Sequence, residues 1–278
     1  MIIDAHCHQW NLALNRHAWL DDPGAAPLRR TFDRPDHCAA AHGLPLGGAV
    51  CVQAEESAAE LAWLRRAETS PGIPTLGVVA AVDLSGPRIS RHVATFGNRT
   101  PDRATAAAPV VGVRDARMLD ATGPGPDPAA MALLAERGLT VDLLVPDRGR
   151  LAAVVHLVAA YPANRFVLDH LPQVCPPGRS AAAHRAAMGV LADLPNLTVK
   201  VSGLRMEDSH GEPLRRLLRI AFEFFGSRRL MYGSDWPVST AGRALGASVR
   251  TLGEHLGDLT DAERDDFWHR TALTAYGL

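Results

Sequence analysis

The sequence predicts an α/β fold, a single (β/α)8 TIM barrel with a long loop after its first strand. Short β-rich runs alternate with longer helical stretches along all 278 residues. The apolar runs recur at a mean spacing of roughly 30 residues, the length of one strand–loop–helix–loop unit. Near-continuous apolar strands between helices are typical of a parallel sheet, and eight such units close a barrel. No linker divides the chain, so residues 1–278 are expected to form one domain.

The eight predicted strands are short, apolar and rich in β-branched residues, and they cover Met1–Ala5, Gly48–Val52, Thr75–Val82, Val110–Val113, Thr140–Val145, Arg165–Asp169, Leu197–Val201 and Arg229–Tyr232. Apolar residues at helical spacing predict helices between them, among others over Ser57–Arg66, Arg88–Phe96, Pro128–Arg137 and Arg150–Ala160. Residues 11–46 exceed an ordinary βα loop, and we expect them to form a lid or rim beside the first strand.

Composition excludes several classes of partner. The formal net charge is -1 and the arginines are scattered, which disfavours nucleic acid binding. No apolar run is long enough for a membrane span and no targeting segment is recognisable, so a cytoplasmic protein is expected. The four cysteines lie at wide spacings without a C-x-x-C pair, so the sequence predicts neither a disulfide framework nor a structural zinc site. The oligomeric state is not predicted.

Polar residues stand where the predicted strands end. In a barrel of this kind the carboxyl ends of the strands surround the active site. The candidate site residues are therefore those that close each run, namely His6, His8, Gln53, Asp83, Arg114, Asp142, His170, Lys200, Ser202 and Asp235. Among the other histidines, His17 and His210 lie in loops that border the same mouth.

His6 and His8 are two apart on one strand, so their side chains share a face and project together toward the mouth. Imidazoles and a carboxylate such as Asp235 are a usual ligand set for zinc, and a bound ion lowers the pKa of water for attack on a carbonyl. The alternative is that both rings form hydrogen bonds to neighbours in a polar barrel mouth. Cys7, between them, points the opposite way and is expected to pack behind the site.

In this order and at these strand ends, the motifs resemble the amidohydrolase superfamily, in particular its lactonase branch of 2-pyrone-4,6-dicarboxylate, L-fuconolactone and L-rhamnonolactone hydrolases. The matching phrases span almost the whole chain: Ile3-Asp4-Ala5-His6-Cys7-His8 with Trp10, Val52-Gln53-Ala54, Gly112-Val113-Arg114, Asp142-Leu143-Leu144, Val167-Leu168-Asp169-His170, Lys200-Val201-Ser202-Gly203-Leu204 and Tyr232-Gly233-Ser234-Asp235-Trp236-Pro237-Val238. The resemblance implies a small-molecule lactone as substrate. It also implies that Asp235 takes a proton from the attacking water and that His170 polarises the lactone carbonyl.

Further roles are expected around these two residues. Lys200 is a candidate to stabilise the oxyanion, although it could instead pair with an acid inside the barrel. Arg114 suits bidentate recognition of a carboxylate or hydroxyl. The remaining substrate-binding candidates are Gln53, Ser202 and Trp236. Asp169 is expected to face away from His170 and to be structural. After Arg114 the chain runs Asp115-Ala116-Arg117, where the lactonases usually carry a histidine. The sequence therefore does not predict which lactone is the substrate.

The fifth strand lacks the histidine that metal-rich amidohydrolases place there, which disfavours a two-metal centre. We favour the prediction that one divalent ion, most simply zinc, binds to His6, His8 and Asp235, with or without His170. The alternative is catalysis without a metal. Two further functions stay open: a metal-dependent nonoxidative decarboxylase of the same superfamily, and a noncatalytic binding barrel.

Overall fold

The computed structural model describes residues 1–66, 72–86, 89–96, 107–120, 123–145, 148–204, 211–241 and 243–278. One eight-stranded parallel sheet follows the order of the chain, with β1 (Ile2–Cys7), β2 (Leu46–Val52), β3 (Thr75–Ala81), β4 (Val110–Arg114), β5 (Thr140–Leu143), β6 (Arg165–Leu168), β7 (Leu197–Val201) and β8 (Leu230–Tyr232). Beyond β8, Trp236 bridges Cys7 in parallel, and the Asp235 N–H donates to the His6 carbonyl oxygen at 2.7 Å. These contacts close the sheet, so the predicted (β/α)8 barrel is confirmed.

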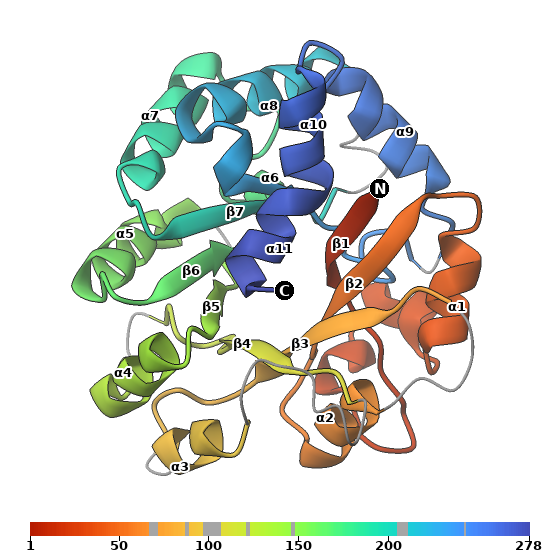
Figure 1. Ribbon diagram of the computed structural model, residues 1–278, viewed down its shortest axis with the longest axis vertical. Helices are drawn as coiled ribbons and strands as arrows, with labels where there is room; N and C mark the ends of the chain where they lie inside the picture. Colours follow the sequence, from red (N-terminus) through yellow and green to blue (C-terminus); the bar gives the residue numbers. More distant parts are fainter. Residues whose placement is uncertain are drawn as a thin grey trace.

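Helices surround the barrel (Figure 1). They are α1 (Arg34–Ala40), α2 (Ala58–Arg65), α3 (Ile89–Ala94), α4 (Pro128–Glu136), α5 (Leu151–Ala160), α6 (Leu171–Val174), α7 (Ala181–Ala192), α8 (Glu212–Phe225), α9 (Gly246–His255), α10 (Asp261–Asp265) and α11 (Thr271–Tyr276). The short turns η1 (Ala18–Asp21), η2 (Pro23–Leu28), η3 (Arg148–Arg150) and η4 (Ser227–Arg229) are 3-10 helices, and η5 (Asp266–Arg270) is a π-helical turn. No helix in the described ranges is long and apolar enough to cross a membrane.

Local sequence explains where these helices begin. Ser57 caps α2 by accepting a hydrogen bond from the Glu60 N–H, which places the start of this helix where the sequence predicts it. Asp33 and Asp36 form a reciprocal capping box at the start of α1. In α8, the apolar residues Leu214, Leu217, Leu218, Ala221 and Phe225 recur at helical spacing and are all buried against the barrel.

The long segment after β1 forms a packed rim rather than an open loop. It contains η1, η2 and α1, and Trp10 forms an antiparallel bridge with Phe32. The rings of Trp10, Phe32 and Trp236 belong to one buried cluster with Leu20 and Leu28. This cluster fixes the rim beside the mouth. The helix predicted over Arg88–Phe96 corresponds to α3, whereas residues 97–106 lie outside the described ranges.

Helix α11 closes the end of the barrel opposite the mouth. In Figure 1 this last helix and the carboxyl terminus lie across the centre of the ring of strands. Ala272 and Tyr276 pack against Ile3, Val50 and Met231 in one buried cluster. The Tyr276 hydroxyl donates to Asp142 Oδ2 at 2.7 Å, so the helix also reaches polar groups inside the barrel.

Candidate active site

Four polar atoms converge at the carboxyl end of the strands. His8 Nε2 lies 3.1 Å from His6 Nε2 and 3.4 Å from Asp235 Oδ1. Asp235 Oδ1 is also 3.7 Å from His6 Nε2 and 3.9 Å from His170 Nε2. All four side chains are buried, with residue exposures of 0 to 5%. The structure therefore brings together the four residues that the sequence places first among the candidates.

Unusual backbone conformations aim two of these side chains. His170 lies two residues after β6 and Asp235 three residues after β8, and both have left-handed φ angles, of 53° and 52°. Non-glycine residues with positive φ cluster at functional sites because the surrounding structure must hold them there. Gly203 makes room for the His170 ring, since a Cβ at this glycine would lie 2.9 Å from His170 Nδ1. Gly233 likewise lets its strand approach β1, because a Cβ would meet His6 Cβ at 2.7 Å.

The other ring nitrogen of each histidine has a partner that orients the ring. His8 Nδ1 is 2.6 Å from the Val52 carbonyl oxygen, which can only accept, so this nitrogen carries the proton. In this tautomer His8 presents a lone pair on Nε2 to the centre. His6 Nδ1 lies 3.2 Å from Asp169 Oδ1, and His170 Nδ1 lies 3.0 Å from the Ser202 hydroxyl. Carboxylate, carbonyl and hydroxyl partners of this kind are typical of metal-ligating histidines.

The spacing of the donor atoms of His6, His8 and Asp235 fits a single ion. Zinc with bonds of about 2.0 to 2.2 Å to nitrogen and oxygen places its ligands roughly 3.3 to 3.5 Å apart. The separations of 3.1, 3.4 and 3.7 Å among His6 Nε2, His8 Nε2 and Asp235 Oδ1 bracket this range. These three residues would hold a divalent ion. His170 Nε2, 3.9 Å from Asp235 Oδ1, lies beside them.

The surroundings of the centre keep the Asp235 carboxylate ionised and the His6 and His170 rings neutral near pH 7. Burial alone raises the pKa of Asp235, but His170, His8 and His6 outweigh it, so the net shift is downward and the carboxylate stays ionised. Its Oδ2 also accepts a 2.5 Å hydrogen bond from the Ser239 hydroxyl. Burial lowers the pKa of His6, helped by the Lys200 charge, and burial lowers that of His170. Both rings are thus neutral near pH 7.

Below this centre lies a buried ionic layer. The Lys200 ammonium is 2.7 Å from Asp142 Oδ2 and 2.9 Å from Asp169 Oδ1, and all three residues are fully buried. Burial lowers the pKa of Lys200, but Asp142 and Asp169 outweigh it and raise the pKa overall, which keeps the ammonium charged. Lys200 therefore forms ion pairs with acids inside the barrel, which is one of the two roles that the sequence left open for it. Since its charge is already compensated by two carboxylates, we assign it a positioning role beneath His6.

The expectation for Asp169 is wrong. Its carboxylate does not face away from the site but contacts His6 Nδ1 at 3.2 Å and an Arg114 nitrogen at 3.4 Å. β6 ends at Leu168, and the left-handed turn at His170 breaks the strand alternation on which that expectation rested. Asp169 connects Lys200 and Arg114 to a histidine of the centre, a role that strand periodicity alone does not reveal.

Arg114 ends β4 in the wall of the mouth, as predicted. One guanidinium nitrogen donates to the Gln53 carbonyl oxygen at 3.1 Å and another to Asp169. These contacts hold the planar group in place beside the centre. Its position suits recognition of a substrate oxygen.

Three predicted substrate contacts have other partners in the structure. The Gln53 amide oxygen accepts a hydrogen bond from the Ala81 N–H, and the amide nitrogen donates to the Ser57 carbonyl oxygen. Gln53 therefore joins the end of β2 to β3 and to the start of α2. The Ser202 hydroxyl faces His170 and orients that ring. Trp236 is fully buried, with its ring 5.5 Å from Phe32 and 5.0 Å from His37, and belongs to the rim's core. In the structure all three residues support their neighbours, and a direct contact of any of them with substrate stays a prediction.

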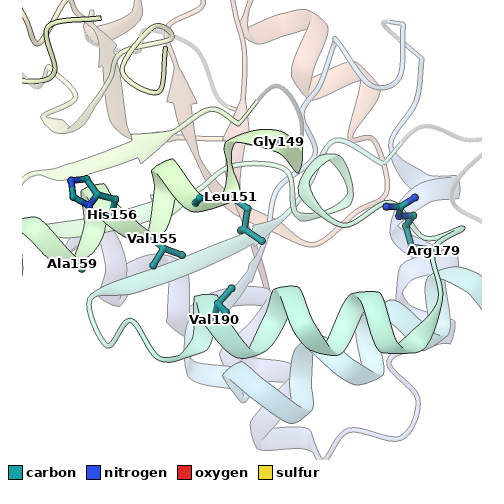
Figure 2. Close-up of a pocket in the computed structure, with 8 residues that line it drawn as sticks. Gly149, Leu151, Val155, His156, Ala159, Arg179 and Val190 are labelled. Atoms are coloured by element: carbon teal, nitrogen blue, oxygen red, sulfur yellow. The ribbon is translucent and has the colours of Figure 1, made fainter. Parts of the chain in front are cut away.

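Of the two loop histidines, His17 is buried in the rim and lies 2.9 Å from Glu60 Oε1, whereas His210 lies outside the described residues. A separate groove of about 980 Å³ runs between α5 and α7 on the outer surface (Figure 2). It is lined mainly by apolar residues, with His156 and Arg179 apart from each other along it. Because no set of reactive side chains converges there, we locate the chemistry at the barrel mouth.

The lowered histidine pKa values predict how metal-free protein responds to acid. In the unfolded chain His6 and His170 titrate near 6.5. Just below that pH the two rings are therefore protonated in the unfolded state and still neutral in the folded state. We expect the free energy of unfolding to fall as the pH drops from 7 toward 5, by up to about 2.7 kcal/mol per pH unit for two rings. Urea denaturation at several pH values in the presence of chelator measures this slope. A His6→Asn variant should show a shallower slope, and an equal slope would contradict the assignment.

Comparisons with known proteins agree with this geometry. The chain matches the family model described as "Amidohydrolase" over residues 3–278. It is 29% identical to an L-fucono-1,5-lactonase of Burkholderia multivorans over 99% of this chain and 96% of that protein, and 32% identical to an L-fucono-1,5-lactonase of Burkholderia ambifaria over 85% and 80%. A crystal structure of a Burkholderia multivorans amidohydrolase with bound zinc superposes with a TM-score of 0.78, at 25% identity, over 100% of this chain and 99% of that one. With the family model covering nearly its whole length, this chain belongs to the amidohydrolase family.

Proposed function

We propose that this protein is a lactonase that adds water to the carbonyl of a lactone ring, most directly the ring of a sugar acid. The observation that carries the proposal is the convergence of one ionised carboxylate, Asp235, with the imidazoles of His6, His8 and His170 in a buried mouth. The two L-fucono-1,5-lactonase relatives support a sugar-acid lactone as the substrate class.

The residues divide the reaction between them. Asp235 accepts a proton from the attacking water while the water oxygen bonds to the lactone carbonyl carbon. The negative charge that develops on the carbonyl oxygen needs a donor, and the His170 ring can supply one because the Ser202 hydroxyl can donate to, or accept from, its Nδ1. When the ring carbon–oxygen bond breaks, the leaving oxygen takes the proton held by Asp235. Arg114 orients a substrate oxygen from the wall.

We further propose that His6, His8 and Asp235 hold one divalent ion, with zinc as the simplest candidate. Such an ion polarises a carbonyl and lowers the pKa of water. The zinc-bound relative and the ligand spacing support this assignment. Asp169 and the Val52 carbonyl position the two rings through their Nδ1 atoms.

A lactone panel tests the proposal. Aldonolactones, carboxylated pyrones and muconolactones are offered to metal-free and zinc-loaded protein, and ring opening is followed by acid release. We expect the aldonolactones to be opened fastest and zinc-loaded protein to be the more active form. Carbon dioxide release from aromatic acids without any lactone opening would instead identify a decarboxylase. Tight binding of lactones without turnover would identify a binding barrel.

A further inference from the structure

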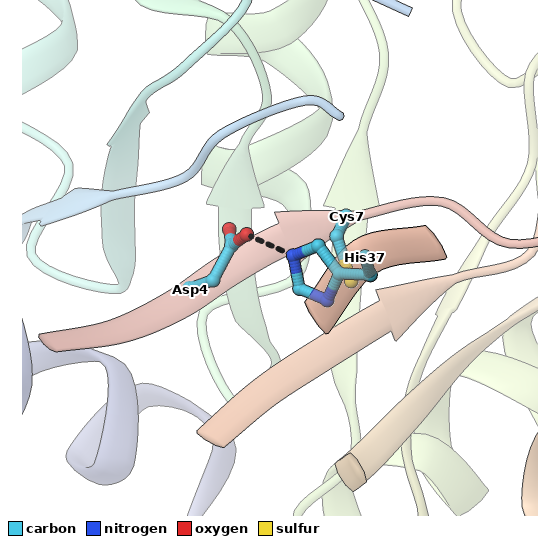
Figure 3. Close-up of side chains that lie close together, drawn as sticks. All are labelled: Asp4, Cys7 and His37. Carbon is cyan, nitrogen blue, oxygen red and sulfur yellow. Dashed lines mark ion pairs between the residues drawn. The ribbon is translucent and has the colours of Figure 1, made fainter. Parts of the chain in front are cut away.

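A second group of metal-binding side chains lies behind β1, outside the barrel. Asp4 and Cys7 come from β1 itself, and His37 comes from α1 in the rim (Figure 3). One donor atom of each lies within 4.8 Å of the other two. The residues are buried, with exposures of 0%, 0% and 1%. None of them belongs to the centre at the mouth.

Two of the donor atoms, Asp4 Oδ2 and His37 Nε2, lie close together, and each can bind a further partner. His37 Nε2 is 3.3 Å from Asp4 Oδ2, yet it is buried without a hydrogen bond to any described residue. Asp4 Oδ1 already accepts from the backbone N–H groups of His6 and Ser234. Its Oδ2 accepts only the Ser234 hydroxyl, at 2.6 Å, and so keeps one acceptor site on the side of His37. Among the described residues this buried nitrogen therefore has an ion-pair contact with Asp4 but no well-aligned hydrogen bond.

A second thiol lies next to the group. Cys51 is paired with Cys7 across β1 and β2, and the two Sγ atoms are 3.6 Å apart. Its sulfur is not one of the three donor atoms that lie within 4.8 Å of one another. The 3.3 Å between His37 Nε2 and Asp4 Oδ2 matches a nitrogen and an oxygen on the same ion.

We propose that Asp4, Cys7 and His37 form a second site, for a soft divalent cation such as zinc. Thiolate and imidazole donors select zinc and its soft analogues over magnesium or calcium. The ion replaces the Cys7 thiol proton and joins α1 of the rim to the back of β1, whose last residues include His6. Its role is structural, because all three donor residues are buried and no substrate can reach them.

Cadmium provides a selective probe, because only a thiolate ligand gives cadmium a strong ultraviolet charge-transfer band. The centre at the mouth offers nitrogen and oxygen alone, so cadmium bound there contributes no such band. Metal-free full-length protein is titrated with cadmium chloride, and the band is recorded alongside the number of ions retained after dialysis. We expect the band to saturate at one equivalent of thiolate-bound cadmium.

Matched variants assign the band to its cysteine. Cys7→Ser is nearly isosteric and should abolish the band, while Cys175→Ser, a buried cysteine in another part of the barrel, should keep it. His37→Gln should weaken cadmium binding at least about tenfold. Circular dichroism confirms that each variant is folded. The proposal is overturned by wild-type protein that shows no band, or by a Cys7→Ser band as strong as that of wild type. Either result leaves the lactone assay unaffected, so this site and the proposed function fail independently.

Discussion

Replacing Asp235 by Asn is expected to lower kcat/KM for an accepted lactone by at least about 10³-fold, because the amide can neither accept the proton of water nor carry the negative charge that the three histidines surround. The substitution keeps the side-chain shape, and the amide oxygen can still accept the hydrogen bond from Ser239. We therefore expect the fold and the melting temperature to stay close to those of wild type.

The matched control is Asp261→Asn, which makes the same chemical change at a carboxylate whose side chain is 99% exposed. Its kcat/KM should equal that of wild type. Steady-state kinetics on both variants, together with circular dichroism, separate the loss of a reacting group from a loss of folding. Near-normal turnover in folded Asp235→Asn would remove this residue from the chemistry.

Replacing Lys200 by Met should have the largest effect on stability. The ammonium lies between Asp142 and Asp169 in a fully buried layer, so its removal leaves Asp142 without its countercharge and Asp169 with Arg114 as its cationic partner. Breaking a buried pair in this way costs about 3 to 5 kcal/mol. For a chain of this size such a loss lowers the melting temperature by on the order of 10 °C.

The pair of Arg185 and Glu223 supplies the comparison. Its side chains are 47% and 50% exposed, and solvent screening leaves an exposed ion pair with little effect on stability. Arg185→Met should therefore shift the melting temperature far less than Lys200→Met. Adding Asp142→Asn to Lys200→Met should recover part of the loss, because it removes the charge left without its countercharge. Equal shifts for Lys200→Met and Arg185→Met would contradict the assigned role of Lys200.

Much of the fold follows from the sequence because the relevant signals are local. Apolar runs at regular spacing locate the eight strands to within two residues of their observed bounds. Ser57, Asp33 and other capping residues mark the starts of helices. The convergence of His6, His8, His170 and Asp235 also follows, because the carboxyl ends of parallel strands meet at one mouth.

The supporting contacts do not follow from the sequence because they depend on side-chain directions across the barrel. Lys200 ends a strand like a substrate-binding residue, and only the positions of Asp142 and Asp169 show that it is paired. Gln53, Ser202 and Trp236 occupy family motifs, but their polar groups or rings support the neighbours that form the site. The left-handed turn at His170 is a further feature that a period-two strand pattern cannot reveal.

The second group of donors illustrates the same limit. The four cysteines lack the close spacing that marks a zinc site in a sequence, and Asp4, Cys7 and His37 come together only when α1 folds over the back of β1. Spacing along the chain is informative when two ligands share a turn, and it carries no signal when tertiary packing assembles the site.

We propose that one centre, built by His6, His8, His170 and Asp235, holds a single divalent ion and opens lactones. A zinc titration of metal-free protein, in which the rate of aldonolactone opening is recorded at each step, tests this proposal. Cys7→Ser protein serves as the sample, so that only the mouth takes up zinc. The rate is expected to rise linearly and to reach its plateau at one equivalent. No lactone opening at any zinc level would contradict the proposed function, and a full rate before zinc is added would contradict the role of the ion.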